Sequence, residues 1–155
     1  MRFPVLPLRD VAATATFCFC TLQSSSTLPK FLPNGWAKNI LSDVENLTEE
    51  KIDDILNQFL KDFKEGSIET KGWPAIMSAY NISKAALHGY SRILAKTYSS
   101  FYINVVCPGY VKTDMTQNCG LQTPDEGAES VVRLALLPNG SPSGLFFLRS
   151  EVGSF

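Results

Sequence analysis

The clearest hydrophobic pattern in the chain lies between residues 48 and 66. Apolar residues recur there at three- and four-residue steps, with acidic residues and lysines between them. This spacing gives a helix one apolar and one charged face. Thr48 is a suitable N-cap because Glu49 and Glu50 follow it, and Gly66 is a suitable stop. We predict a helix over residues 48–65 whose apolar face comprises Ile52, Ile55, Leu56, Phe59, Leu60 and Phe63.

A second, longer helix is predicted after the break at residues 72–74, from about Ala75 or Ser78 to Thr97. Many of the residues on its predicted inner face are small, which permits close approach of another helix or of a cofactor. That face comprises Ile82, Ala85, Ala86, Gly89, Ile93 and Leu94.

Strand and turn signals alternate with these helices. Phe101 to Cys107 is predicted to be a strand buried on both faces, and residues 145–148 a short final strand. A third helix is predicted to start at Thr123, with Pro124 in its first position. Residues 27–38 contain two prolines and an Asn-Gly pair and are predicted to be loop. Alternating strands and helices are typical of an α/β fold with a parallel sheet.

The N-terminal 22 residues allow two interpretations. Two arginines precede an apolar run that is long enough for the core of a signal peptide but too short to span a membrane. The same run, Ala15 to Leu22, is rich in aromatic and β-compatible residues and is closed by three serines, as a buried strand would be. We favour the strand.

Composition argues against several kinds of partner. The chain has 155 residues, a net charge of −1 and a sequence pI of about 5.8, so nothing indicates binding to nucleic acid or to an anionic membrane. The four cysteines and one histidine show no metal-ligand spacing, and no metal site is predicted. Idle thiols in a reducing compartment are the favoured interpretation of Cys18, Cys20, Cys107 and Cys119, which indicates the cytoplasm.

The strongest chemical candidate is the pair Tyr80 and Lys84 near the start of the second helix. A spacing of four places both side chains on one helical face, about one turn apart. An ammonium group beside a phenol favours the phenolate and lowers the pKa of the phenol, which would make Tyr80 a general acid or base. The alternative is two unrelated residues on a solvated face.

In wider context, these residues resemble the short-chain dehydrogenase/reductase family. The family patterns Tyr-x-x-x-Lys and Pro-Gly-x-x-x-Thr are matched by residues 80–84 and 108–113. Residues 71–74, 125–129 and 134–138 are similar to the carbonyl reductase branch, which includes the plant menthone, neomenthol and salutaridine reductases. The charged helix over residues 48–65 is similar to the helical insertion of that branch. The likeness covers roughly residues 24–155.

The resemblance implies a role for each matching residue. Tyr80 would give a proton to the carbonyl oxygen, Lys84 would assist it and contact the nicotinamide ribose, and Ser25 would steady the carbonyl. The register of the catalytic serine among Ser24, Ser25 and Ser26 stays open. The cofactor implied is NADP(H), and its nicotinamide end would be bordered by Pro108, Gly109, Val111 and Thr113.

The chain also departs from the family pattern. The printed sequence contains no Gly-x-x-x-Gly-x-Gly turn for the pyrophosphate and no Asn-Asn-Ala-Gly strand. We therefore interpret residues 24–155 as the C-terminal, catalytic half of a doubly wound Rossmann-type reductase, and residues 1–23 as a divergent segment that retains a strand. Two hypotheses follow from this: a carbonyl reductase or alcohol dehydrogenase truncated before its cofactor-binding half, or a non-catalytic remnant acting through protein contacts.

The chain as given is expected to be inactive and to bind no NADPH. The full-length relatives are expected to be monomers that act on a small carbonyl or alcohol substrate. The isolated chain is instead expected to self-associate, because an uncharged strand over residues 15–22 would present a bare sheet edge.

Overall fold

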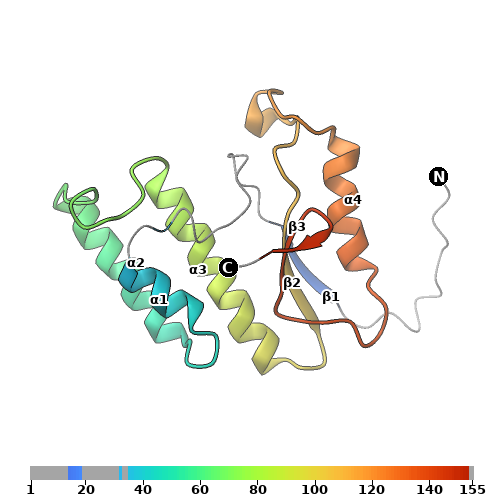
Figure 1. Ribbon diagram of the computed structural model, residues 1–155, viewed down its shortest axis with the longest axis horizontal. Helices are drawn as coiled ribbons and strands as arrows, with labels where there is room; N and C mark the ends of the chain where they lie inside the picture. The colour runs from blue at the N-terminus through green and yellow to red at the C-terminus, as the bar shows by residue number, and fades with distance from the viewer. Residues whose placement is uncertain (1–13, 19–31, 33–34, 154–155) are drawn as a thin grey trace.

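The computed structural model of the chain describes residues 14–18, 32 and 35–153 (Figure 1). Helices connect the parallel strands, as the sequence pattern predicts. In chain order the elements are β1 (Thr14–Cys18), α1 (Gly35–Ser42), α2 (Glu49–Lys64), α3 (Ser78–Thr97), β2 (Tyr102–Cys107), the 3₁₀ turn η2 (Asp114–Thr116), α4 (Pro124–Ala135), β3 (Phe146–Leu148) and β4 (Glu151–Val152).

The described strands form one sheet in the order β1-β2-β3-β4. β1, β2 and β3 are parallel, whereas β4 pairs with β3 in the antiparallel direction. The predicted strand over residues 101–107 is confirmed as β2, and its last five residues are buried. The predicted strand over residues 145–148 is confirmed as β3. The short strand β4 was not predicted, because two residues leave no periodic signal.

β1 supports the interpretation of the N-terminal apolar run as a strand rather than as the core of a signal peptide. Its register aligns Thr14 with Tyr102 and Cys18 with Val106, so it is the parallel neighbour that the sequence requires for residues 101–107. Residues 19–22 of the predicted strand lie outside the described residues. Within the part of the sheet that the structure describes, β1 is an edge strand.

One helix covers each face of the sheet, as a doubly wound α/β fold requires (Figure 1). Neighbouring residues of β2 point to opposite faces. On one face Val105 packs with Phe146, whose ring lies 5.3 Å from that of His88 on α3. On the other face Val106 packs with Leu134 of α4. The fold is therefore a partial Rossmann-type α/β fold with helices on both faces.

The predicted helix over residues 48–65 is confirmed as α2, but two residues of its predicted apolar face, Leu60 and Phe63, are exposed. The side chain of Thr48 accepts a hydrogen bond from the Lys51 backbone N–H (3.4 Å), and Gly66 follows the helix with a φ of 68°. α1 and α2 lie on the side of α3 that faces away from the sheet (Figure 1). Their apolar faces meet α3 in one core: Leu32, Ala37, Leu41, Leu47, Ile52, Ile55, Phe59, Trp73, Ile82, Ala85 and Ala86.

The prediction of loop over residues 27–38 is wrong from Gly35 onward, where α1 begins. The Asn-Gly pair was interpreted as a turn, yet Ala37 and Leu41 lie one helical turn apart and are almost completely buried. Tertiary packing of this short apolar face outweighs the local turn signal. The helix is only eight residues long, so its periodicity is weak in the sequence.

The predicted inner face of α3 is confirmed for Ile82, Ala85, Ala86 and Gly89, which are buried, whereas Ile93 and Leu94 are half-buried. At Gly89 the helices approach closely: a Cβ there would lie 3.1 Å from Cδ2 of Leu41. His88 and Ser91 are also buried on α3, although the sequence pattern did not include them.

None of the helices that the structure describes is long and apolar enough to cross a membrane. No group of three or more His, Cys, Asp or Glu side chains among the described residues is arranged to hold a metal ion. Cys107 is a buried free thiol and Cys119 an exposed one.

Candidate active site

Tyr80 and Lys84 lie on the first two turns of α3, which begins at Ser78. The Lys84 Nζ atom lies 5.5 Å from the centroid of the Tyr80 ring. Both side chains are half-buried, and the hydroxyl oxygen of Tyr80 is itself buried. A cation this close to an aromatic face is attracted to it. The predicted one-turn proximity is present, and the catalytic roles of the two residues stay predictions.

The backbone before Tyr80 is unusual. Met77, the N-cap residue of α3, has a φ of 51° and provides no side-chain cap. Left-handed conformations of non-glycine residues cost on the order of 1 kcal/mol and cluster at functional sites. Asn81 holds this turn with two hydrogen bonds: its backbone N–H donates to the Met77 carbonyl (2.9 Å) and its Nδ2 donates to the Ile76 carbonyl (3.0 Å).

The second part of the candidate site is the loop that leaves β2 at Pro108 and leads to α4. Its two limbs are joined by an isolated parallel bridge between Val111 and Gln122, with the Lys112 N–H donating to the Gln122 carbonyl (2.8 Å). In the orientation that satisfies both ends of its side-chain amide, Gln122 donates to the Pro108 carbonyl (2.7 Å) and accepts from Arg149 Nε (3.3 Å). These contacts fix the start of the loop.

Gly109 is the second residue of this loop and has a φ of 92°. A Cβ at this position would meet the side-chain amide of Gln122, so both the backbone angle and the space favour glycine. The next turn is closed by Thr116, whose hydroxyl donates to the Val111 carbonyl (2.6 Å) and accepts from the Thr113 N–H (3.0 Å). Thr113 itself is exposed.

A hollow of about 500 Å³ opens between this loop and α4. Of the four residues predicted to border the nicotinamide end of the cofactor, Pro108, Val111 and Thr113 line this hollow, whereas Gly109 does not. α4 approaches the loop closely, since a Cβ on Gly127 would lie 2.6 Å from Cγ2 of Val111. The lining comprises Pro108, Val111, Thr113, Asp114, Met115, Pro124, Gly127, Ala128 and Val131.

The two parts of the candidate site belong to the same end of the sheet. A short connection joins the C-terminus of α3 to the N-terminus of β2, so the helix and the strand run in opposite directions. The N-terminal turn of α3, with Tyr80, therefore lies toward the carboxyl end of β2, where Pro108 begins the loop. In α/β sheets, ligands bind outside the carboxyl ends of the parallel strands. β1 also directs its carboxyl end toward this edge.

Ser24, Ser25 and Ser26 lie outside the described residues, so the predicted catalytic serine and its register stay predictions.

His88, one turn beyond Lys84 on α3, was not predicted to be part of the site. Its side chain is completely buried, and burial, assisted by the nearby Arg92 charge, lowers its pKa from 6.5 to about 3. The four-residue spacing from Lys84 and the occurrence of a single histidine in the chain were the available signals. His88 packs against Phe146 and thus lies where α3 meets the sheet.

The chain is similar to known reductases over most of its length. The profile described as short chain dehydrogenase matches residues 66–123. A (+)-neomenthol dehydrogenase of Capsicum annuum is 58% identical over 134 residues, which cover 86% of this chain and 43% of that protein. A carbonyl reductase (NADPH) 1 of Homo sapiens is 38% identical over 116 residues, covering 70% of this chain and 41% of that protein.

Solved structures give the same result. The structure of salutaridine reductase from Papaver somniferum superposes with a TM-score of 0.76 and 46% identity, covering 90% of this chain and 46% of that one. Menthone neomenthol reductase from Mentha piperita superposes with a TM-score of 0.70 and 45% identity, covering 93% and 43%. The chain thus spans less than half the length of the relatives that it matches.

Proposed function

Because the chain resembles part of the short-chain dehydrogenases/reductases in both sequence and fold, we propose that it carries the catalytic side of an NADPH-dependent carbonyl reductase or alcohol dehydrogenase. The observation that carries this proposal is the position of Lys84 Nζ, 5.5 Å from the Tyr80 ring centroid, on a helix whose first turns lie toward the carboxyl edge of a parallel sheet. The substrate proposed is a small ketone or aldehyde, or the corresponding alcohol, in the cytoplasm.

The described residues fit the nicotinamide end of the cofactor. The loop hollow is mainly apolar, as an aromatic ring requires, and Thr113 adds a hydroxyl that suits a carboxamide. Pro108, Gly109, Val111 and Thr113 would hold this end, and Lys84 would contact the ribose. NADP(H), when bound, supplies a hydride for reduction or accepts one for oxidation. We assign no residues to the pyrophosphate, because the printed sequence has no glycine-rich turn.

In the reducing direction, Tyr80 transfers its hydroxyl proton to the carbonyl oxygen of the substrate, which becomes the alcohol oxygen. The charge of Lys84 stabilises the phenolate that is left behind, and this lowers the barrier to proton transfer. Ser25 donates a hydrogen bond to the same oxygen and stabilises its developing negative charge. In the oxidising direction the Tyr80 phenolate accepts the proton of the alcohol.

The test joins this chain to the cofactor-binding part of the Capsicum annuum relative and measures NADPH-dependent ketone reduction. Tyr80→Phe removes the proton donor and keeps the ring, so we expect turnover to fall by at least about a hundredfold, the usual contribution of a positioned acid or base. Lys84→Met is expected to impair the fusion as well, and Lys84→Arg to restore it only in part.

Tyr90→Phe is the matched control, because Tyr90 lies on the same helix and is partly exposed beside α2. Its turnover should stay close to that of the parent fusion. Near-normal turnover of the Tyr80→Phe fusion would contradict the proposed function.

A further inference from the structure

The segment that leads into α3 is tied to α2 at Trp73. The indole is almost completely buried and packs edge-to-face on Phe59 of α2, with ring centroids 5.4 Å apart. The Trp73 backbone N–H donates to the Ile68 carbonyl (2.9 Å). Both the side chain and the main chain of Trp73 are therefore held by the helical part of the molecule.

A buried carboxyl group completes this attachment. Asp62 of α2 is 2% exposed and accepts hydrogen bonds from Nε1 of Trp73 (2.7 Å) and Nε2 of Gln58 (2.8 Å). Buried polar groups need such partners, since a buried donor or acceptor without one is costly. Asp62 therefore fixes the depth and the rotation of the indole ring.

Only the short segment of residues 74–79 separates Trp73 from Tyr80. Pro74, which is buried and has a restricted φ, follows Trp73, and Met77 makes the left-handed turn into α3. The first turn of α3 lacks a side-chain N-cap, which normally stabilises the start of a helix. Tyr80 is the third residue of that helix, so its position depends on the turn that is least supported by the helix itself.

We propose that Asp62 is a positioning residue for Tyr80. By holding Trp73, it keeps the first turn of α3 formed and the Tyr80 phenol in place at the carboxyl edge of the sheet. The catalytic part of this statement rests on the proposed function. The attachment itself is a property of the fold and can be measured without any turnover.

The first measurement is amide hydrogen exchange on the chain as it stands. The Asn81 N–H, bonded to the Met77 carbonyl, reports on the first turn of α3, and the Tyr98 N–H, bonded to the Leu94 carbonyl (2.8 Å), reports on its end. Asp62→Leu should accelerate exchange at Asn81 at least about tenfold more than at Tyr98, because it leaves the indole N–H without an acceptor. Trp73→Phe, which keeps an aromatic ring, should have the same effect if the leucine variant does not fold.

Two variants serve as controls. Asp62→Asn keeps an oxygen that can accept from the indole and should preserve the protection of Asn81. Gln58→Leu removes the other bond to the same carboxyl without touching Trp73, and should change Asn81 and Tyr98 equally. Equal loss of protection at both ends of α3 in Asp62→Leu would overturn the proposal, since Asp62 would then only stabilise the whole fold.

The second measurement is turnover in the fusion described above. Asp62→Leu should lower kcat about tenfold with a smaller change in KM, and Asp62→Asn should restore it. The double variant Asp62→Leu/Trp73→Phe removes both partners, so it should recover thermal stability but not kcat. Recovery of both would overturn the positioning role.

The two measurements separate the possible failures. Loss of turnover without selective loss of Asn81 protection would overturn the attachment proposed here. Selective loss of protection in a fusion that keeps its full turnover would overturn the catalytic assignment of Tyr80 and leave the attachment standing.

Discussion

The two sides of the molecule are packed differently. The helical unit, α1 to α3, buries apolar residues from all three helices in a single core. The sheet unit, β1 to β4 with η2 and α4, divides its buried residues between two small clusters, because β2 contributes side chains to both faces. A helical bundle can close around its own apolar faces, whereas a sheet must be covered on each face separately.

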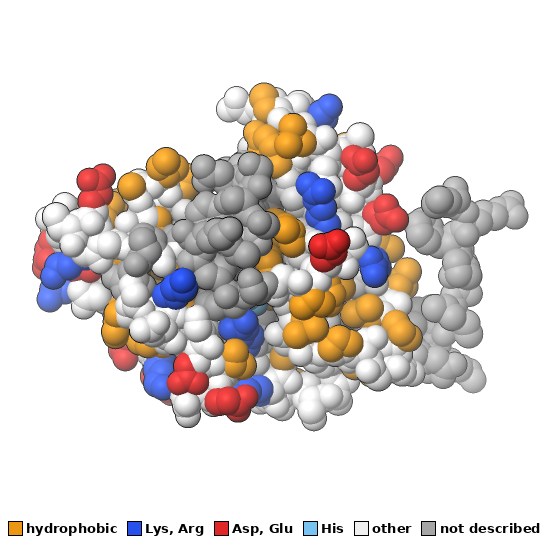
Figure 2. Space-filling view, viewed as in Figure 1, with side chains coloured by type: hydrophobic (Ala, Val, Ile, Leu, Met, Phe, Trp, Pro, Cys, Tyr) orange, Lys and Arg blue, Asp and Glu red, His pale blue; other side chains and the backbone are white. Residues whose placement is uncertain are grey.

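Large exposed apolar residues occur on both units. Apolar side chains are visible over the sheet and α4, on the right of the space-filling view (Figure 2). The large exposed apolar residues include Val132 on α4 and Val152 on β4 in the sheet unit, and Leu60 and Phe63 on α2 in the helical unit. β1 is an edge strand among the described strands. The self-association expected of the isolated chain stays a prediction.

The candidate site draws on both units. Tyr80 and Lys84 come from α3 of the helical unit, and the loop from Pro108 to Thr113 comes from the sheet unit. The geometry of any proton transfer there depends on how firmly α3 rests on the sheet. Four predictions test this contrast, beginning with the largest expected effect.

Leu41→Ala and Leu134→Ala remove the same atoms from the two units, and both leucines are almost completely buried. Leu41 belongs to the larger buried cluster and lies at the close helix approach beside Gly89, so we expect little collapse of the cavity. Leu134 has half-buried neighbours that can move into the space. We expect losses of about 4–5 kcal/mol for Leu41→Ala and about 2–3 kcal/mol for Leu134→Ala in the free energy of unfolding, measured by urea denaturation.

Leu137→Ala, at a half-buried position of the sheet unit, is the control and should cost least. Equal losses of unfolding free energy for Leu41→Ala and Leu134→Ala would mean that the two units are packed equally well. That result would contradict the proposed difference in packing between the helical unit and the sheet unit.

His88 provides a test of the junction between the units. Burial, followed in importance by the charge of Arg92, lowers its pKa from 6.5 in the unfolded chain to about 3 in the fold. The native state thus binds fewer protons than the unfolded state below pH 6.5, so stability is complete above that pH and falls as the pH decreases toward 3. Between pH 6.5 and 4.5 we expect a loss on the order of 2–3 kcal/mol, at about 1.4 kcal/mol per pH unit.

His88→Gln replaces the imidazole by an amide that does not titrate in this range. The variant should have a nearly flat stability profile between pH 6.5 and 4.5, whatever its absolute stability. The exposed carboxyl groups of Asp43, Glu50 and Glu126, whose pKa values hydrogen bonding lowers, lose their contribution at lower pH. A slope that is the same in both proteins would assign the acid sensitivity to a group other than His88.

The sequence predicted most of this fold because its strongest elements carry two signals at once. α2 has a regular apolar face and a capping threonine, and α4 has Thr123, Pro124 and two acidic residues at its start. β2 is mostly apolar, as is typical of a strand covered on both faces, and its one amide residue, Asn104, is buried. Local propensity and tertiary environment agree at each of these places.

The failures occur where tertiary contacts decide. α1 forms because Ala37 and Leu41 fill the helical core, although Asn34-Gly35 signals a turn. His88 is buried by the approach of Phe146 from a strand far along the chain. For the candidate site, the spacing predicted that Tyr80 and Lys84 would be close, but no local pattern indicated the left-handed Met77 or the attachment at Asp62.

The caps of the two units give a smaller contrast. Thr123 forms a complete capping box on α4: its hydroxyl accepts from the Glu126 N–H (3.3 Å) and its own N–H donates to the Glu126 carboxylate (2.8 Å). Thr48 on α2 accepts one long bond (3.4 Å). Thr123→Ala should cost about 1 kcal/mol and Thr48→Ala less, as measured by denaturation. A larger loss for Thr48→Ala than for Thr123→Ala would show that α4 depends less on its cap than α2 does.

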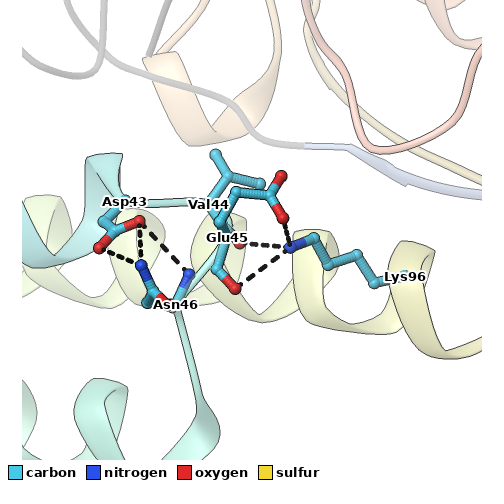
Figure 3. A network of polar contacts seen from close by, with 5 residues as sticks. All are labelled: Asp43, Val44, Glu45, Asn46 and Lys96. Atoms are coloured by element: carbon cyan, nitrogen blue, oxygen red, sulfur yellow. Dashed lines mark hydrogen bonds and ion pairs between the residues drawn. The ribbon is translucent and has the colours of Figure 1, made fainter.

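The smallest effect is expected at the surface of the helical unit. The ammonium group of Lys96 on α3 donates to the backbone carbonyls of Val44 (2.8 Å) and Glu45 (3.4 Å), and pairs with the Glu45 carboxylate at 3.0 Å (Figure 3). It thus ties the turn between α1 and α2 to α3. Both charged side chains are largely exposed, so water screens their attraction.

Lys96→Met keeps the aliphatic stem and should cost less than about 1 kcal/mol in the free energy of unfolding, measured by urea denaturation. Glu45→Gln removes the ion pair but leaves both backbone acceptors, so it should cost still less, and only its effect should vanish at high salt. A loss of several kcal/mol for Lys96→Met would mean that the helical unit is held together by this exposed turn. The single apolar core would then not explain why this side of the molecule is the better packed one.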